Sequence, residues 1–591
     1  MDGSKFVDQL VEAINTQDVK TLLHLCCDSS KRDNILKFTD DDGNRLIHLV
    51  ASFGSIDLIR TLIEIGADVK EKNCDQKTVL HVASSYGNTK VVTYLLQTDD
   101  DLKNDATICE KKDYKNMLYY AAKSGNIETV ESLQNIGHFD INKIFPNGST
   151  TLLVLVKEDD SKGVETLCRC GADVNLGSIS MNSIEHGYKA IHVASEQYSS
   201  RNRHDRDVEM IRILLKYNAN VNEPYITSES IMQPLFMVLR RRKLHNASVL
   251  LENGADISFQ GKTQDETIGC FCLAIQRCPS LVPEFIKRGA NLYETHQNCS
   301  VLMIAIYSNA GSEVIEALVK AGADIKFGRN GKTVIQCCER YDQIKSFLTA
   351  GISVQDIESK HKVSTLGMAV ATFTWDHLYY MTQSLDLKNE IADLISKGAN
   401  LDMAIEGHDT PIIKAIKMNL LDVFEMLIAT GANIDKPGKD GNTAVHVSCI
   451  ESKWKYLETL IESGADLNKA NSTCIYPLEL ALRYFNDTKS NVSKEDIITK
   501  MLDKGANPNL TAPGKNSPLI LAIEKRLDII VEILLHKGAD ISHIGKQEST
   551  AFETCLRSGE QTNNQLSDSP ENFRADRSLP NKQYHPMSDL L

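Results

Sequence analysis

Apolar residues along the chain fall into pairs of short stripes at helical spacing. In the stretch "KTVLHVASSYGNTKVVTYLLQT", which begins at residue 77, one stripe covers residues 79–83 and a second covers 91–96. This spacing predicts two short amphipathic helices that share one buried interface. Thr78 stands where an N-cap oxygen accepts hydrogen bonds from the first amides of a helix, and Gly87 stands where the first helix ends in a left-handed conformation.

The same pair of stripes recurs along most of the chain. The second stripe ends in phrases such as "LIEIGAD", "LLENGAD", "LVKAGAD" and "LLHKGAD", whose glycine, or the residue in its place, marks each unit. The markers are Gly66, Asp99, Gly137, Gly171, Asn218, Gly254, Gly289, Gly322, Gly351, Gly398, Gly431, Gly464, Gly505 and Gly538. Successive markers are most often 33 residues apart. A single helix pair cannot bury its own stripes, so neighbouring pairs are expected to stack.

A second phrase precedes the marker by about eighteen residues, as in "TVLHVAS", "AIHVASE" and "AVHVSCI". The two linked phrases resemble the ankyrin repeat over roughly residues 5–560. The resemblance implies an all-α solenoid of about 14–15 stacked helix-turn-helix units with projecting hairpin loops. It further implies that hairpin tips and first helices line a concave surface for protein partners.

Several residues at equivalent positions of the repeat are expected to have structural roles. The resemblance implies that a histidine at one equivalent position hydrogen-bonds to nearby backbone, and the glycine of each marker is expected to end a second helix. Between units, Asp42-Gly43 and Asp440-Gly441 are expected to form tight reversals. The structural repeat residues are Thr78, His48, His81, His192, His446, Gly66, Gly171, Gly254, Gly322, Gly431, Gly464 and Gly538.

Departures from the period suggest the domain organisation. Residues 1–38 read as N-terminal capping helices, 39–350 as a first arm of the array, 351–388 as an irregular or inserted segment and 389–560 as a second arm. The stretch "SSRNRHDRD" at 199–207 is expected to be a loop between paired helices. Residues 561–591 are polar and hold three of the 14 prolines, which predicts a disordered C-terminal tail.

Composition agrees with a helical protein and limits its partners. Hydrophobic residues make up 42% of the chain and aromatic residues only 6%, which suits aliphatic helical cores. The net charge of -14 and the pI near 5.7 argue against nucleic acid or acidic membrane as the main partner. Charged residues such as Asp2 and Lys5 interrupt the N-terminus, and no long apolar run occurs, so we expect neither a secretory signal nor membrane insertion.

The sequence gives little support for a metal-binding or phosphate-binding site. The 15 scattered cysteines predict reduced thiols in a cytoplasmic or nuclear setting, without a disulfide framework. Cys168 aligns with positions that other units fill with Leu or Ile, so we interpret it as a buried small side chain and not a metal ligand. The Gly-Lys-Thr phrases at 261–263 and 331–333 have Asp256 and Lys326 where a phosphate-binding loop needs its first glycine. We therefore expect no enzyme activity, cofactor or metal.

Two basic stretches stand out from the repeat. Arg240, Arg241, Arg242 and Lys243 lie at a predicted turn between paired helices, and the insertion one unit earlier carries Arg201, Arg203 and Arg206 at the same turn. Stacking would bring these charges to one edge, where they could dock an acidic or phosphorylated peptide or another anion. The competing interpretation is two solvated turns, since runs of charge usually face water.

Aromatic residues and the tail give further candidates. Trp375, His377, Tyr379 and Tyr380 fall in the irregular segment, where packing is favoured over binding, whereas Trp454 is expected to be exposed and to contact a partner. In the tail, Ser567, Ser569 and the C-terminal Asp589-Leu590-Leu591 match short motifs that arise often by chance.

Three functional hypotheses remain open. The first is a non-catalytic scaffold or adaptor for protein partners of unknown identity, and the second is a substrate-recruiting adaptor or host-targeting effector. The third is an anion or nucleic-acid binder acting through the basic stretches. The candidate partner-binding residues are Arg201, Arg203, Arg206, Arg240, Arg241, Arg242, Lys243, Trp454, Asp440 and Asp42.

Overall fold

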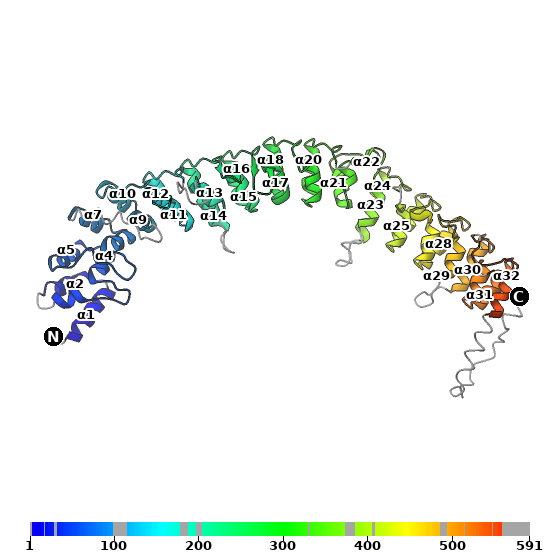
Figure 1. The fold of residues 1–591 in the computed structure, drawn as a ribbon, viewed down its shortest axis with the longest axis horizontal. Helices are drawn as coiled ribbons and strands as arrows, with labels where there is room; N and C mark the ends of the chain where they lie inside the picture. Colours follow the sequence, from blue (N-terminus) through cyan, green and yellow to red (C-terminus); the bar gives the residue numbers. More distant parts are fainter. Residues whose placement is uncertain are drawn as a thin grey trace, which may run out of the picture. The chain divides into compact units, whose positions relative to one another are not determined.

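The computed structural model divides into two compact units, residues 1–310 and 311–591, each built from short paired helices (Figure 1). It describes residues 3–16, 18–28, 32–98, 115–177, 187–196, 204–328, 331–372, 384–404, 408–484, 493–512, 514–546 and 548–557. This architecture confirms the predicted stack of helix-turn-helix units.

The first unit contains α1 (Gly3–Asn15), α2 (Val19–Cys26), α3 (Arg32–Lys37), α4 (Leu46–Phe53), α5 (Ile56–Glu64), α6 (Val79–Ser85), α7 (Thr89–Thr98), α9 (Met117–Ser124), α10 (Ile127–Asn135), α11 (Thr151–Lys157), α12 (Ser161–Arg169), α13 (Ala190–Glu196), α14 (His204–Lys216), α15 (Pro234–Arg240), α16 (Leu244–Glu252), α17 (Cys270–Arg277), η2 (Pro279–Leu281), α18 (Val282–Lys287) and α19 (Val301–Tyr307). The second unit contains α20 (Ser312–Lys320), η3 (Ile335–Cys337), α21 (Tyr341–Thr349), α22 (Val354–His361), α23 (Thr365–Thr372), α24 (Ser384–Ser396), α25 (Pro411–Lys417), α26 (Leu421–Ala429), η4 (Lys439–Gly441), α27 (Ala444–Ile450), α28 (Trp454–Glu462), α29 (Pro477–Tyr484), α30 (Lys494–Asp503), α31 (Pro518–Glu524) and α32 (Asp528–His536).

The pair α6 and α7 shows how the sequence forms each repeat. Thr78 is the N-cap residue of α6, with its hydroxyl oxygen 2.8 Å from Nδ1 of His81, and Gly87 follows the C-cap with φ +69°. The apolar stripes of the two helices are buried and face each other, and α6 also packs against α4 and α9. Because α7 likewise packs against α5 and α10, the core continues from one repeat to the next.

The markers behave as predicted at most positions. Each marker glycine assigned to the repeat, from Gly66 to Gly538, has positive φ, and Asn218 takes the same conformation with φ 65°. Gly137 is an exception, because the residue with positive φ there is His138. The marker assignment at Gly137 is therefore wrong by one residue, since that loop holds an extra residue before Phe139, whose ring is buried.

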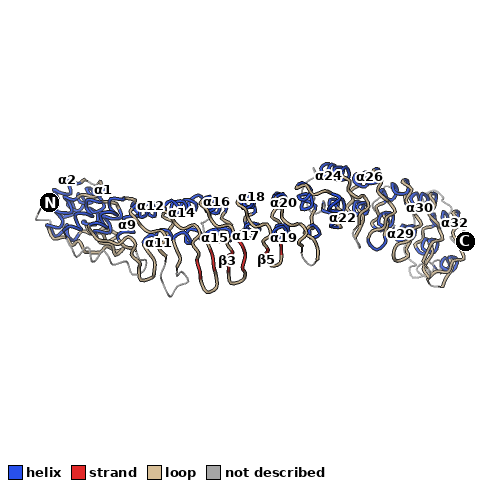
Figure 2. The backbone as a smooth tube through the Cα atoms, turned by 90° about the horizontal axis from the view of Figure 1, so that it is seen from above, coloured by secondary structure: helices blue, strands red, loops and turns tan. Residues whose placement is uncertain are grey.

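Hairpins connect successive pairs. In the first unit, β1 (Tyr225–Ile226), β2 (Ile231–Met232), β3 (Gln260–Lys262) and β4 (Thr267–Gly269) form one antiparallel sheet, while β5 (Thr295–His296) pairs with β6 (Cys299–Ser300) (Figure 2). Ile231 pairs with Lys262, so the hairpins of two neighbouring repeats are hydrogen-bonded to each other. This pairing ties the loops of adjacent repeats together.

The repeat histidines bridge backbone groups of two loops. Nδ1 of His48, His192 and His446 accepts a hydrogen bond from the N-cap amide of its own helix at 3.1–3.2 Å. Their Nε2 atoms lie 3.0, 2.8 and 3.2 Å from the carbonyl oxygens of Glu71, Glu223 and Ile475 in the following loop. A neutral ring protonated at Nε2 satisfies both contacts. His81 likewise accepts from the Thr78 amide, so the predicted backbone bonding of these four histidines is confirmed.

Some expectations for the irregular stretches need correction. Residues 197–203 lie outside the described residues, but α14 begins at His204, so the predicted loop at 199–207 is helical over its last four residues. The predicted irregular segment 351–388 contains α22, α23 and the start of α24, and its aromatic cluster at 375–380 lies outside the described residues. The tail 561–591 also lies outside them.

One repeat places a carboxylate where others place histidine. Glu479 is the third residue of α29, as His446 is of α27, and its side chain is fully buried. Its Oε1 lies 2.6 Å from Nη2 of Arg483, but neither oxygen has a hydrogen bond with acceptable geometry among the described residues. Burial of a charge supported by one partner offers little net stability.

Replacing Glu479 with isoleucine, the residue at the same position in α25 and α31, is expected to stabilise the second unit by about 1–3 kcal/mol, because it removes a poorly compensated buried charge. Glu479→Gln is the control, since it keeps an unpartnered buried polar group. Thermal unfolding followed by circular dichroism measures both variants. A lower midpoint for Glu479→Ile would show that the Arg483 ion pair stabilises the fold.

The buried histidines predict a pH dependence of stability. Burial lowers the pKa of His48, His192 and His446, and lowers that of His81 to about 4. As the pH falls below about 6.5, the unfolded chain therefore binds protons that the folded chain does not. This difference lowers the free energy of unfolding by up to about 1.4 kcal/mol for each unit of pKa difference. We expect the unfolding midpoint to be highest above this pH and to fall between pH 6.5 and 5. The double variant His81→Gln/His446→Gln should show a shallower decrease, and an unchanged slope would contradict this assignment.

Candidate binding surfaces

The four basic residues at 240–243 form the turn between α15 and α16, as predicted. Arg240 is the last residue of α15, Arg241 is its C-cap, and Lys243 is the N-cap of α16. Arg242 lies between them in the left-handed conformation, with φ 60°. Arg240 and Arg242 are exposed, whereas Arg241 and Lys243 are partly buried.

One of these charges is paired. Nη2 of Arg241 donates to Oε1 of Glu196, the last residue of α13, at 3.0 Å. Burial alone would raise the pKa of the Glu196 carboxyl, but hydrogen bonds from Tyr188 and Arg241 outweigh it. The charges of Arg241 and Arg240 act in the same direction, and the pKa is held below its ordinary value. Arg241 therefore joins two neighbouring repeats.

The structure does not describe the side chains of the other predicted basic stretch, at residues 201–206. Arg201 and Arg203 lie outside the described residues, and Arg206 lies on α14 with a side chain that is not described. The next repeat supplies a cation that the sequence interpretation missed. Arg277 ends α17, which packs against α15, and its side chain is exposed. Aligning α17 with α15 would have found it, because Arg277 occupies the position of Arg241.

Trp454 does not provide an exposed aromatic contact. It is the first residue of α28 and only 5% of its surface is accessible, so the expectation of exposure is wrong. Beside it, Nζ of Lys453 donates to Oδ1 of Asn419 in the preceding turn at 3.2 Å. The two neighbouring turns therefore lie close together, and the Trp454 side chain is buried because its repeat is stacked on the preceding one.

Asp42 and Asp440 occupy reversals at the hairpin tips. Both side chains are exposed, and their carbonyl oxygens accept hydrogen bonds from the amides of Cys74 and Ser472 in the following loops at 3.2 and 3.1 Å. The adjacent Gly441 has φ +72°, and a Cβ there would lie 2.7 Å from the Ser472 amide nitrogen. These reversals are therefore fixed by stacking, while their carboxylates remain available to a partner.

Apolar side chains on the hairpins were not found from the sequence. Ile226 and Ile231 are directly opposite each other on β1 and β2, and they are 63% and 36% exposed. Tyr293, two residues before β5, is 72% exposed. In the stretch "YITSESIM", at 225–232, side chains alternate between the two faces of each strand, so one residue of each strand points outward. This alternation is the sequence pattern from which the exposed pair could have been predicted. Exposed apolar groups on a rigid hairpin are suited to contact with a protein partner.

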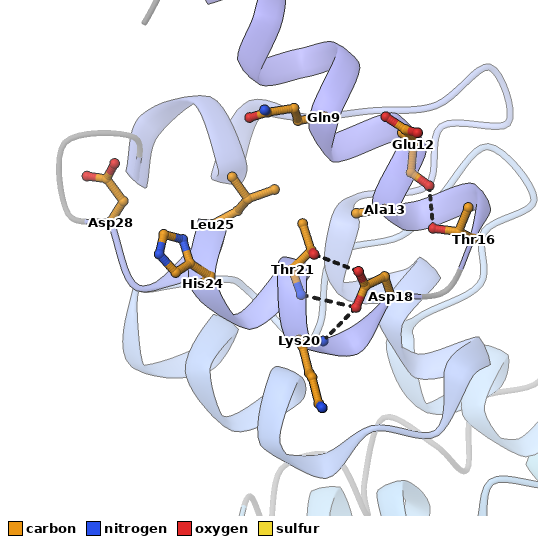
Figure 3. A pocket seen from close by; sticks show the side chains of 10 residues that line it. All are labelled: Gln9, Glu12, Ala13, Thr16, Asp18, Lys20, Thr21, His24, Leu25 and Asp28. Atoms are coloured by element: carbon orange, nitrogen blue, oxygen red, sulfur yellow. Dashed lines mark hydrogen bonds between the residues drawn. The ribbon is translucent and has the colours of Figure 1, made fainter.

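A groove lies at the N-terminal end of the first unit. It has a volume of about 830 Å³ and lies beside α1 and α2 (Figure 3). Asp18 accepts hydrogen bonds from the amides of Lys20 and Thr21 and from the Thr21 hydroxyl. The Thr21 hydroxyl and amide are the main reasons why the pKa of Asp18 is lowered. Asp18 thus caps α2.

The described residues contain no group of three His, Cys, Asp or Glu side chains close enough to hold a metal ion. Cys168 is 6% exposed and burial raises its pKa to about 12, as expected for a side chain that fills space in the core. No helix within the described ranges is long and apolar enough to cross a membrane.

Comparison with known proteins gives one family. The family model described as "Ankyrin repeats (3 copies)" matches residues 2–106 and 378–471. These segments include the first repeats of the first unit and several repeats of the second unit. No curated protein matches the chain.

The left-handed position of Arg242 leads to a stability prediction. Gly54, Gly87 and Gly125 occupy this position, before the N-cap of the second helix, in other repeats. Arg242→Gly should stabilise the protein by about 0.5–1 kcal/mol, because glycine adopts positive φ without steric cost. Arg526→Gly, at the same position in the second unit with φ 55°, is the matched variant. Chemical denaturation tests both, and destabilisation by Arg242→Gly would show that the Arg242 side chain makes compensating contacts.

Proposed function

We propose that this chain, which belongs to the ankyrin-repeat proteins, is a non-catalytic scaffold or adaptor whose hairpin tips and first helices hold partner proteins. Ankyrin repeats imply protein-protein interaction as the general role. The observation that supports the hairpins as the contact is the exposed pair Ile226 and Ile231, with Tyr293 on a later hairpin of the same unit.

Strand pairing within and between these hairpins favours binding of a partner. Residues 225–232 form two strands, and pairing of Ile231 with Lys262 joins them to the next hairpin. A partner would therefore contact side chains whose backbone is already ordered, so little conformational entropy is lost on this side of the interface. Large apolar side chains that become buried at an interface contribute most of its binding energy.

The polar residues that could suggest catalysis have structural partners. His48, His192 and His446 use both ring nitrogens on backbone groups, and burial lowers their pKa. Such rings neither face an open site nor have a free nitrogen for proton transfer. This use of the histidines supports a binding role over an enzymatic one.

The double variant Ile226→Asp/Ile231→Asp tests this proposal. Placing two charges at the hairpin is expected to reduce the recovery of specific partners by at least about tenfold, because both side chains lose burial at the interface. Affinity purification of the full chain with quantitative mass spectrometry measures the recovery of each partner.

Ile529→Asp is the matched control, because Ile529 is 58% exposed but lies on α32, a second helix and not a hairpin strand. Circular dichroism should show that all variants remain folded, since every substituted side chain is exposed. The proposal fails if the double variant keeps every partner, or if Ile529→Asp loses the same partners to the same extent.

A further inference from the structure

Two successive repeats of the first unit bring their helix-helix turns together at the ends of α15 and α17. The cations on these turns are Arg240, Arg241, Arg242, Lys243 and Arg277, which together are called the basic edge. α15 packs against α17, so the turns that follow these two helices are neighbours in the first unit.

The cations of two turns act on one buried group. Sγ of Cys278 donates to the carbonyl oxygen of Leu239 at 3.7 Å, which joins the turn after α17 to the end of α15. Burial raises the pKa of the Cys278 thiol to about 11, while the charges of Arg242 and Arg277 oppose this rise. Both guanidinium groups are therefore close enough to the thiol to affect it, and they reinforce each other's potential.

One nearby carboxylate, Glu196, offsets part of this charge, because Arg241 and Arg240 both act on it. Arg241 pairs with Glu196, as described above. Arg240, Arg242 and Arg277 are exposed, and within the residues described by the structure none of them forms an ion pair. The chain as a whole carries a net charge of -14, so the basic edge is a local reversal of its overall electrostatic character.

Arginine at position 242 is also conformationally unfavourable. The residue has φ 60°, at a position that is glycine in some repeats and Asp159, Asn419, Ser452 or Arg526 in others, and the left-handed conformation costs a residue with a side chain about 1 kcal/mol. Arg526 has the same conformation in the second unit, so this strain is shared by several repeats, and it is the exposed charges of the basic edge that favour a ligand.

We propose that the basic edge binds an acidic segment of a partner protein. Helices pack about 8–10 Å apart, so the two turns extend over roughly 10 Å. An extended peptide rises about 3.3 Å per residue, and about three residues therefore cover this distance. Carboxylates on such a segment would meet the exposed guanidinium groups, which form paired hydrogen bonds with carboxylate oxygens.

Protein is a better fit than nucleic acid. The basic edge is short, and a long polyanion bound there would pass over neighbouring surface of a chain with net charge -14. A short acidic segment matches the extent of the positive surface and avoids this repulsion. Because each first helix runs from a hairpin to a turn, the basic edge lies at the opposite end of these helices from Ile226 and Ile231. The two surfaces can therefore be tested separately.

The test uses the full chain and a short fluorescently labelled peptide of Asp and Glu, with binding measured by anisotropy. The peptide should bind, and its affinity should decrease as salt is added, because screening weakens contacts between exposed charges. Arg240→Glu/Arg242→Glu should lower the affinity by about tenfold or more, since each reversal replaces attraction with repulsion. Arg277→Glu should lower it in the same direction.

Lys525→Glu/Arg526→Glu is the matched control, because it makes the same change in net charge at the equivalent turn of the second unit. This control and Ile226→Asp/Ile231→Asp should both leave peptide affinity unchanged. The proposal is overturned if the peptide does not bind, or if the control lowers affinity as much as Arg240→Glu/Arg242→Glu. It is also overturned if a single-stranded oligonucleotide of equal charge binds as tightly through the same arginines.

Discussion

Helices of seven residues, such as α6 and α15, are too short to persist alone in water, because helix nucleation is costly and few hydrogen bonds follow. They persist here because each is covered by its paired helix and by the first helices of the repeats on either side, as α6 is covered by α4, α7 and α9. Burial of one repeat by the next is therefore the constraint on which the other features depend. Phe236 and Phe271, on two successive first helices, show the extent of this burial, since both are only 1% exposed.

Stacking also decides how the loops are held. The reversal at Asp42 and Gly43 accepts a hydrogen bond from the next loop, and His48 reaches the carbonyl of Glu71 in that same loop. A backbone group of each loop is thus satisfied by its neighbour and not by its own repeat. The loops remain exposed on their outer side, so their side chains can vary without disturbing these bonds. This separation allows a common scaffold to carry different binding surfaces.

The residues that fix the scaffold could be predicted from the sequence because they act within one repeat. Thr78, Gly87 and the Nδ1 hydrogen bonds of the repeat histidines depend on positions within a few residues along the chain, whereas the Nε2 bonds of His48, His192 and His446 reach the following loop. Trp454 and Arg241 could not be placed in the same way, because the burial of one and the ion pair of the other depend on a neighbouring repeat. The exposed pair Ile226 and Ile231 required the strand register, which the short turn between them did not reveal by itself.

The turns and the hairpins have different physical requirements even though one helix connects them. A hairpin side chain must be apolar to gain from burial against a partner, and this is tolerated because the strands below it are paired. A turn needs a residue that accepts positive φ, and Arg242 meets that need only with strain. Solvent accommodates its charge when no ligand is present, so the cost is conformational and not one of desolvation. A cation at that turn therefore reduces stability slightly while leaving the stack intact, which is how a repeat array can acquire a charged surface without changing its fold.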